Sequence, residues 1–431
     1  MTQSSDTTTE VSQPIGYLEL VRGNRDFRLL WFGEIVSLLG DWFNLIGSAT
    51  LVANLTGSGL AVGLLFVVRM LAPFLISPIA GVITDRYNKK AILIWTDIGR
   101  AVAVAGLLLV RDANDLWLLY LLIALQMGLT GFFFPARNAI LPDIVDPEAL
   151  GTANALGATT WSTMLTLGAA LGGLVAGTLG IYAAFAIDAV TFLVSALILI
   201  QINYQTIPAL ATADQHLKAA FQQYVDGLRY LRQNRHIFVV TLHKGILTLI
   251  IGASFEVVQV KITEEVFTIG EGGSLSLGLM FAVFGFGTAA SPLLARIFTG
   301  DRAYAMSVAI AVGYLTAGVG MAIIAPLFSF PAVLFGTLLR GLGDAVIWVF
   351  STQLLLQLTS AHVRGRVFAM DFAFWTLTGA VGSALAGLAL DSPLGITGSV
   401  WLMSGLSLIP AILWAWWLLK FFRADQSSEP S

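Results

Sequence analysis

The segment that joins two long apolar stretches reads Gly81-Val-Ile-Thr-Asp85-Arg86-Tyr87-Asn88-Lys89-Lys90. The apolar stretches on either side, 60–83 and 91–110, are each long enough for a helix to cross a bilayer, which takes about 20 mainly apolar residues. A short basic connection between two such stretches predicts a pair of membrane helices joined by a turn in water.

The same pattern continues along the whole chain. Of the 431 residues, 57% are hydrophobic and 11% are charged, whereas soluble domains carry about 25% charged residues. We therefore expect an all-α integral membrane protein with twelve spans, at 28–52, 60–83, 91–110, 116–140, 152–178, 181–203, 237–259, 275–298, 304–325, 331–356, 366–390 and 397–420.

The composition also excludes several classes of site. Cys is absent and the chain contains only 4 His, so we expect no disulfide, no thiolate nucleophile and no metal centre. A net charge of −3 gives no basic field for nucleic acid. No Gly-Lys-Ser/Thr loop for nucleotide phosphates occurs, and we expect no cofactor.

The distribution of Lys and Arg predicts the orientation. With the N-terminus in the cytoplasm, seventeen of the 23 Lys and Arg lie on the inner side, and only Arg111 and Lys261 lie outside. We expect both termini in the cytoplasm and the protein in the plasma or inner membrane. Residues 1–14 form a polar, disordered tail without a signal peptide, and residues 421–431 form a second polar tail.

An internal repeat divides the spans into two sets of six. A shift of 214 residues superposes Gly151 on Gly365, Trp161 on Trp375, and Ser77-Pro78 on Ser291-Pro292. We predict two six-helix lobes in parallel orientation, at 1–203 and 237–431. The connection 204–236 should contain an amphipathic cytoplasmic helix, because apolar residues recur at helical spacing at Leu217, Phe221, Tyr224, Leu228 and Leu231.

The segment 81–90 resembles the cytoplasmic signature of the major facilitator superfamily, which reads Gly, three residues, Asp, Arg or Lys, any residue, Gly and two basic residues. Here Asn88 replaces the second Gly, and we expect Asn to keep a left-handed turn. The resemblance implies a latch between the lobes when the central cavity faces outward. The candidate latch residues are Gly81, Asp85, Arg86, Lys89, Lys90, Arg137, Arg364 and Arg366.

Further stretches resemble bacterial exporters of the enterobactin and macrolide group. They are Phe27-Arg28-Leu29-Leu30-Trp31, Leu39-Gly40-Asp41-Trp42, Phe134-Pro135-Ala136-Arg137-Asn138-Ala139 and Arg364-Gly365-Arg366-Val367. Drug antiporters of the superfamily carry Gly-Pro-x-x-Gly-Gly in the fifth span. Here Gly168, Gly172 and Gly173 allow close helix packing, but Ala169 stands in place of Pro, which puts the antiporter inference in question.

Charges inside spans are costly and are therefore candidates for function. Asp41 and Arg69 fall at similar depth in adjacent spans, and we expect them to pair. Asp41 is then either a coupling or substrate site or half of a permanent ion pair. Glu34, seven residues earlier on the same helix face, either extends a proton path or packs at the cytoplasmic end.

The second repeat carries its own candidates. Arg340 and Asp344 are four residues apart and should pair, either as a site or as a self-neutralising pair. The 214-residue shift places Gln126 opposite Arg340. Lys244 either faces the cavity or extends toward the cytoplasm. The remaining charges, together with His243, are expected in structural or interfacial positions: Asp97, Arg100, Asp188, Glu256 and Asp371.

The resemblance and these charges together favour a secondary transporter that works by alternating access. The leading hypothesis is proton-coupled export of an amphipathic small molecule, such as a drug, a siderophore or a lipid-like metabolite, by a monomer in the lipid bilayer. The alternative transport hypothesis is a facilitator or proton symporter for uptake. A lipid-modifying membrane enzyme is the alternative of another class, but the sequence lacks a cluster of His, Asp or Ser that would serve it.

Overall fold

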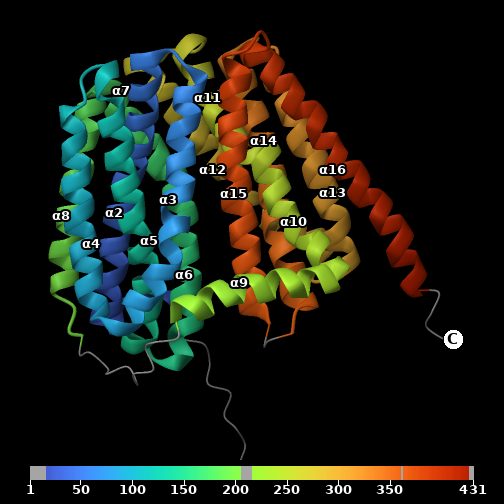
Figure 1. Ribbon diagram of the computed structural model, residues 1–431, viewed down its shortest axis with the longest axis horizontal. Coiled ribbons are helices and arrows are strands. Elements are labelled where there is room, and N and C mark those ends of the chain that lie inside the picture. Colours follow the sequence, from blue (N-terminus) through green and yellow to red (C-terminus); the bar gives the residue numbers. More distant parts are fainter. Residues whose placement is uncertain (1–15, 205–215, 361–362, 427–431) are drawn as a thin grey trace, which may run out of the picture.

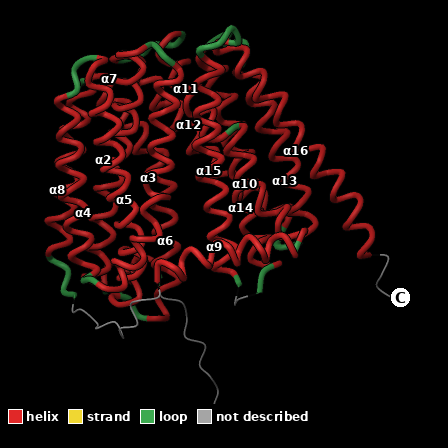
Figure 2. The backbone as a smooth tube through the Cα atoms, viewed as in Figure 1, coloured by secondary structure: helices red, strands yellow, loops and turns green. Residues whose placement is uncertain are grey.

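The computed structural model describes residues 16–204, 216–360 and 363–426, and within these ranges all regular secondary structure is helical (Figure 1, Figure 2). The α-helices are α1 (Tyr17–Gly23), α2 (Arg25–Thr56), α3 (Gly59–Arg86), α4 (Lys89–Gly106), α5 (Leu116–Ile144), α6 (Leu150–Thr163), α7 (Ala169–Thr178), α8 (Ile181–Ile200), α9 (His216–Gln233), α10 (Arg235–Ile250), α11 (Gly252–Glu265), α12 (Ser274–Thr299), α13 (Ala303–Ile324), α14 (Phe330–Leu358), α15 (Arg364–Leu390) and α16 (Gly395–Gln426).

Within the described ranges, 11 helices are long and apolar enough to cross a membrane, with α10 and α11 counted as one. This confirms the expected all-α membrane fold. The remaining expected span, 152–178, is helical throughout but contains a π-helical turn at Met164–Gly168. This turn separates α6 from α7, so each piece is shorter than the roughly 20 residues of a span. Ala169 directly follows the turn, so the interruption of this helix is a π-turn and not a proline kink.

The helices pack in two groups that follow the chain order. Figure 1 shows the helices before residue 204 on the left and those after residue 216 mainly on the right. In the first group α2 packs mainly against α8, and α3 and α4 pack against α5. In the second group α14 packs against α12 and α13, and α10 packs against α15. The two groups meet where α3 contacts α15 and where α7 contacts α12. The lobe boundaries at 203 and 237 stay predictions.

The helix α9 lies crosswise at the lower end of the bundle in Figure 1, at the place where the linker helix was expected. It contacts α3 of the first group and α10 and α15 of the second. Leu231 is fully buried, whereas Leu228 is exposed. The side chains of Leu217, Phe221 and Tyr224, and residues 205–215, lie outside the described part, as do residues 1–15 and 427–431.

Candidate functional site

A cluster of buried charged and polar side chains lies inside the first group of helices. Asp41 of α2 is at its centre: one carboxylate oxygen lies 3.8 Å from Nη1 of Arg100, and the other accepts a 3.3 Å hydrogen bond from Nε2 of Gln126. Arg69 of α3 instead donates to Oδ1 of Asn44 at 3.3 Å. The expected Asp41–Arg69 pair is therefore wrong. The physical reason is that α2 packs mainly against α8 rather than against its chain neighbour α3.

Arg100 of α4 links Asp41 to Asp97. Its Nη2 also binds Asp97, and its guanidinium lies 4.4 Å from the ring centres of both Phe133 and Phe192. Only 2% of the Arg100 side chain is exposed, so the aromatic rings replace much of its hydration. The buried Asp97–Arg100 pair fits the expected structural role, and its contact with Asp41 was not predicted.

Asp188 of α8 belongs to the same cluster. It lies against the backbone of α2 at Gly40: a β-carbon at position 40 would come within 2.2 Å of Asp188 Oδ1. A side chain at position 40 would displace this carboxyl group. The contact of Asp188 with α2 was not predicted, and the sequence signal that could have found it is the glycine next to Asp41.

Glu34 and Arg137 form a second buried pair, closer to the α9 end of α2. Arg137 of α5 donates from Nε at 3.1 Å and from Nη2 at 2.9 Å to the same Glu34 oxygen. A β-carbon at Gly157 would lie 2.6 Å from Nη2 of Arg137, so α6 approaches closely enough to cover the guanidinium. In this structure Arg137 thus binds Glu34 inside the first group. This contact favours the packing role for Glu34 over the proton path.

In the second group, Arg340 and Asp344 of α14 form the expected pair at 3.5 Å. Arg340 is 1% exposed and lies 4.0 Å from the ring centre of Phe284 and 4.8 Å from that of Phe255. Glu256 of α11 faces Arg340 and, across the boundary between the groups, Arg69. The interfacial position expected for Glu256 is wrong, because α11 continues α10 inside one span.

Lys244 and Asp371 form another pair, between α10 and α15. Both residues are buried, and the Lys244 ammonium lies 4.8 Å from the ring centre of Trp348. Asp371 thus lies buried between α15 and α10, and its depth in the membrane stays a prediction. His243 contacts the Tyr314 hydroxyl at 3.2 Å and packs its ring against Trp414 at 4.4 Å, which fits the expected structural role.

The segment 81–90 makes its contacts within the first group. Lys89 binds Asp143 at 2.6 Å, and Lys90 donates to the backbone carbonyls of Ile200 and Ile202. Asn88 has a φ of −59° and accepts from the Ala91 amide at 3.0 Å, so it caps α4. The expected left-handed turn is wrong, because the capping hydrogen bond needs extended backbone at this position.

The other candidate latch residues lie in both groups of helices. Arg364 of the second group donates to the carbonyls of Thr359 and Leu356 beside it. Apart from its own helix, no described atom lies within 4 Å of a β-carbon placed on Gly81. Asp85 and Arg86 at the end of α3 and Arg366 of α15 are exposed. The latch assignment stays a prediction.

The two groups touch closely at the end of the bundle opposite α9. A β-carbon on Gly63 of α3 would lie 2.5 Å from the Ser383 carbonyl oxygen of α15. A β-carbon on Gly173 of α7 would lie 2.7 Å from the α-carbon of Gly278 in α12. Gly168 and Gly172 pack within the first group, against Trp42 and Phe43. Glycine thus brings helix backbones together both inside the first group and between the groups.

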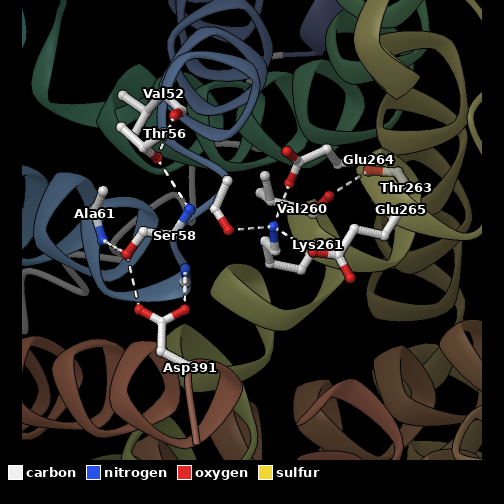
Figure 3. A network of polar contacts seen from close by, with 12 residues as sticks. Val52, Thr56, Ser58, Ala61, Val260, Lys261, Thr263, Glu264, Glu265 and Asp391 are labelled. Atoms are coloured by element: carbon white, nitrogen blue, oxygen red, sulfur yellow. Dashed lines mark hydrogen bonds and ion pairs between the residues drawn. The ribbon is translucent and has the colours of Figure 1, made fainter. Parts of the chain in front are cut away.

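Two charged residues of the second group hold the turn between α2 and α3 at this end (Figure 3). Asp391 accepts hydrogen bonds from the Ser58 hydroxyl at 2.7 Å and from the amides of Gly59 and Leu60 at 2.6 and 2.9 Å. Lys261 donates to the Gly57 carbonyl at 2.9 Å. We call Asp391, Lys261 and the turn 57–60 the far-end clamp.

The charges of the far-end clamp match the helix dipoles. The Asp391 carboxylate lies at the N-terminus of α3, and the Lys261 ammonium lies at the C-terminus of α2. Partial burial alone raises the pKa of Asp391, but the hydrogen bonds from residues 58–60 and the charge of Lys261 outweigh it and lower the pKa. The sequence analysis missed this site, although Lys261 stands out as one of two basic residues in the predicted outer loops.

Comparison with known proteins supports the family expected from segment 81–90. A family model described as Major Facilitator Superfamily matches residues 30–312. The uncharacterized MFS-type transporter YfiS of Bacillus subtilis is 29% identical over 50% of this chain and 51% of its own length. The putative bacilysin exporter BacE of Bacillus amyloliquefaciens is 26% identical over 88% of this chain and 93% of its own. Macrolide efflux protein A of Streptococcus pyogenes is 26% identical over 60% and 66%.

A solved structure of the nucleoside transporter NupG has the same fold, with a TM-score of 0.72 at 14% identity, and covers 90% of this chain and 98% of its own. The expected resemblance to the superfamily and to macrolide exporters is confirmed. These proteins are named as transporters rather than as enzymes, in agreement with the sequence analysis. Within the described ranges, no group of three His, Asp or Glu could hold a metal ion.

Proposed function

Because the chain belongs to the major facilitator superfamily, we propose that it is a proton-coupled secondary transporter that exports an amphipathic small molecule by alternating access. The observation that carries the alternating-access part is the asymmetry of the two ends along α3. Gly63 is packed against α15 at one end, whereas Gly81 has no neighbour within 4 Å at the other. Such asymmetry is expected of a transporter caught with one end closed.

The orientation follows from the positive-inside rule. We assign the lobes to 1–203 and 237–431, the linker with α9 to the cytoplasm, and both termini to the cytoplasmic side of the plasma or inner membrane. In this orientation the far-end clamp is extracellular and the described state is closed to the outside. Segment 81–90 then has the position to close the cytoplasmic end in the opposite state, as the family resemblance implies. Reporter fusions at 111–116 and in the linker test this orientation.

The coupling site in this proposal is the cluster around Asp41. The Asp41 side chain is 21% exposed, whereas those of Asp97 and Arg100 are 0% and 2% exposed. Asp41 is therefore the member of this trio that exchanges protons with water. Its partner Arg100 takes the role that the sequence analysis gave to Arg69. The pairs Arg340–Asp344 and Lys244–Asp371 are the candidates for contact with a charged part of the substrate.

Transport into everted membrane vesicles with an imposed pH gradient tests the proposal. The compounds to screen are a macrolide, bacilysin and enterobactin, chosen by the names of the relatives and by the resemblance. Export coupled to protons requires uptake into everted vesicles that are acidic inside. Asp41→Asn should abolish this uptake and leave downhill exchange, and the exposed control Asp112→Asn should leave both unchanged.

Two outcomes contradict the proposal. Uptake that needs the opposite gradient would support the symporter alternative, which the Ala169 position leaves open. Full gradient-driven transport by an Asp41→Asn, Asp97→Asn, Arg100→Gln triple variant would show that these charges are structural, since removing the two acids together with Arg100 leaves neither acid as an unpaired buried ion.

A further inference from the structure

Asp188 is the acid of the first-group cluster that has no cation as a partner. It is fully buried on α8, and among the described residues it takes part in no ion pair within 4.0 Å. The Thr191 hydroxyl lies 3.4 Å from Oδ1, and Oδ2 has no hydrogen-bond partner. A carboxylate in this position would be desolvated on one oxygen with nothing to replace the lost water, which costs several kcal/mol.

The charges around Asp188 do not remove this cost. The groups that act on it are Asp41 of α2, Arg100 of α4 and Arg69 of α3. Arg100 is already bound to Asp97 and shared with Asp41, and Arg69 donates to Asn44. Three carboxyl groups of the first group, Asp41, Asp97 and Asp188, thus share two guanidinium groups, and Arg69 is also faced by Glu256 of the second group. With every group ionised the acids would outnumber the cations, and one bound proton removes one of the excess negative charges.

We propose that Asp188 holds this proton in the described state, and that the proton leaves through Asp41 during the transport cycle. The inference rests on the proposed proton coupling and names a second residue for it. Asp188 lies against Gly40, directly beside Asp41, and Asp41 is the partly exposed acid of the cluster. The step moves one proton from the Asp188 carboxyl to the Asp41 carboxylate and then to water, and the negative charge passes to Asp188.

Movement of Arg100 is what makes this step possible. Its guanidinium already contacts two acids, and a small rotation of α4 or α8 would bring it from Asp41 toward Asp188. In that arrangement the ionised Asp188 gains a partner as Asp41 gains its proton. A coupling residue of this kind acts only if its partners differ between the two states of the transporter.

Infrared spectroscopy of the purified full-length protein in lipid tests where the proton lies, with H₂O to D₂O exchange as the probe. A buried, protonated carboxyl group gives a carbonyl stretching band that carboxylates lack. We expect this band in the wild type at neutral pH and its loss in Asp188→Asn. Thr191→Val should shift the band without removing it. This variant therefore tests the assignment of the band to Asp188 if Asp188→Asn does not fold. Asp112→Asn, in an exposed loop, should leave it unchanged.

The proposed gain and loss of the Asp188 proton during the transport cycle have their own test. A leucine at Gly63 would clash with Ser383 and hold the far end apart, so Gly63→Leu should populate the opposite state. Proton-driven export moves protons from the outside to the cytoplasm, so Asp188 must take up its proton in the state open to the outside and release it in the state open to the cytoplasm. We therefore expect the Asp188 band of this variant to persist to a higher pH than the band of the wild type. The same pH dependence in both proteins would make Asp188 a structural acid, and a band that survives Asp188→Asn would place the proton elsewhere. If the band behaves as expected but a pH gradient drives no transport, the proposed coupling fails and the proton site stands.

Discussion

The two ends of α3 meet the second group of helices in opposite ways. At Gly59 and Gly63 the backbone touches α15 so closely that a β-carbon would lie 2.5 Å from its atoms, and Asp391 binds the first turn of α3. At Gly81, one span away, nothing lies within 4 Å. The far-end contact therefore depends on close approach of the helix backbones and on a few hydrogen bonds, beside the buried side chains that both groups share.

The largest effect should come from filling the far-end contact. Gly63→Leu adds a side chain where a β-carbon alone is too close to Ser383, and we expect a shift of about 2 kcal/mol, or roughly thirty-fold in population, toward the state open at the far end. Spin labels on Ala113→Cys and Thr397→Cys report the separation, because the chain has no other Cys. An unchanged distance distribution would show that the contact is not specific to one state.

The matched change at the other end sharpens the comparison. Gly81→Leu meets no neighbour in the described state, so the spin-label distances should stay at their wild-type values. If segment 81–90 closes the α9 end in the opposite state, the same variant should lower transport about tenfold, because leucine then blocks that closure. Wild-type transport by Gly81→Leu would contradict the latch.

A smaller effect is expected from the far-end clamp. Asp391→Asn keeps the shape of the side chain but removes its charge and one acceptor at the N-terminus of α3. We expect a loss of about 1 kcal/mol, or about fivefold in population, measured with the same label pair. Ser392→Ala changes the neighbouring residue, whose hydroxyl donates to the Ala389 carbonyl and accepts from the Leu394 amide within the second group, and should leave the distances unchanged. Equal effects of both changes would mean that the loop and not the carboxylate matters.

Acid should reproduce the effect of Asp391→Asn. The pKa of Asp391 is lowered in this state, so the clamp is fully formed above the ordinary carboxyl value of about 4 and is lost as the pH falls through the lowered pKa. The label distances should therefore be constant from pH 7 to pH 5 and should change below about pH 4. In Asp391→Asn this acid transition should be absent, and its persistence would assign it to another group.

The smallest effect should come from a hydrogen bond that lies within one group. The Tyr204 hydroxyl donates to Asp143 at 3.0 Å near the α9 end, and partial burial and this bond raise the pKa of Tyr204 to about 12. Tyr204→Phe should lower the stability by about 0.5–1 kcal/mol, seen as a small fall in Tm. The label distances should not change, since the bond does not join the groups. A change in the label distances would contradict the assignment of this hydrogen bond to the first group alone.

The sequence predicted what depends on local patterns and left out what depends on helix neighbours. Span positions follow from runs of apolar residues, and Arg340 and Asp344 were paired correctly because their spacing of four sets them on one helix face. Asp41 was given the wrong arginine, since Arg69 of α3 binds Asn44, three residues further along α2, while Arg100 of α4 reaches Asp41. The far-end clamp joins residues more than 300 positions apart, which no spacing rule reaches.

The helix α9 has a mechanical consequence. It touches α3 on one side and α15 on the other, and a β-carbon at Gly227 would lie 2.9 Å from the Arg366 carbonyl oxygen. An α-helix resists compression and stretching, and the 18 residues of α9 span about 27 Å at 1.5 Å per residue. Because α9 contacts both groups of helices and keeps its length, it acts as a spacer between them. In the proposed mechanism, the length of this helix therefore limits how closely the two groups of helices can approach each other at this end.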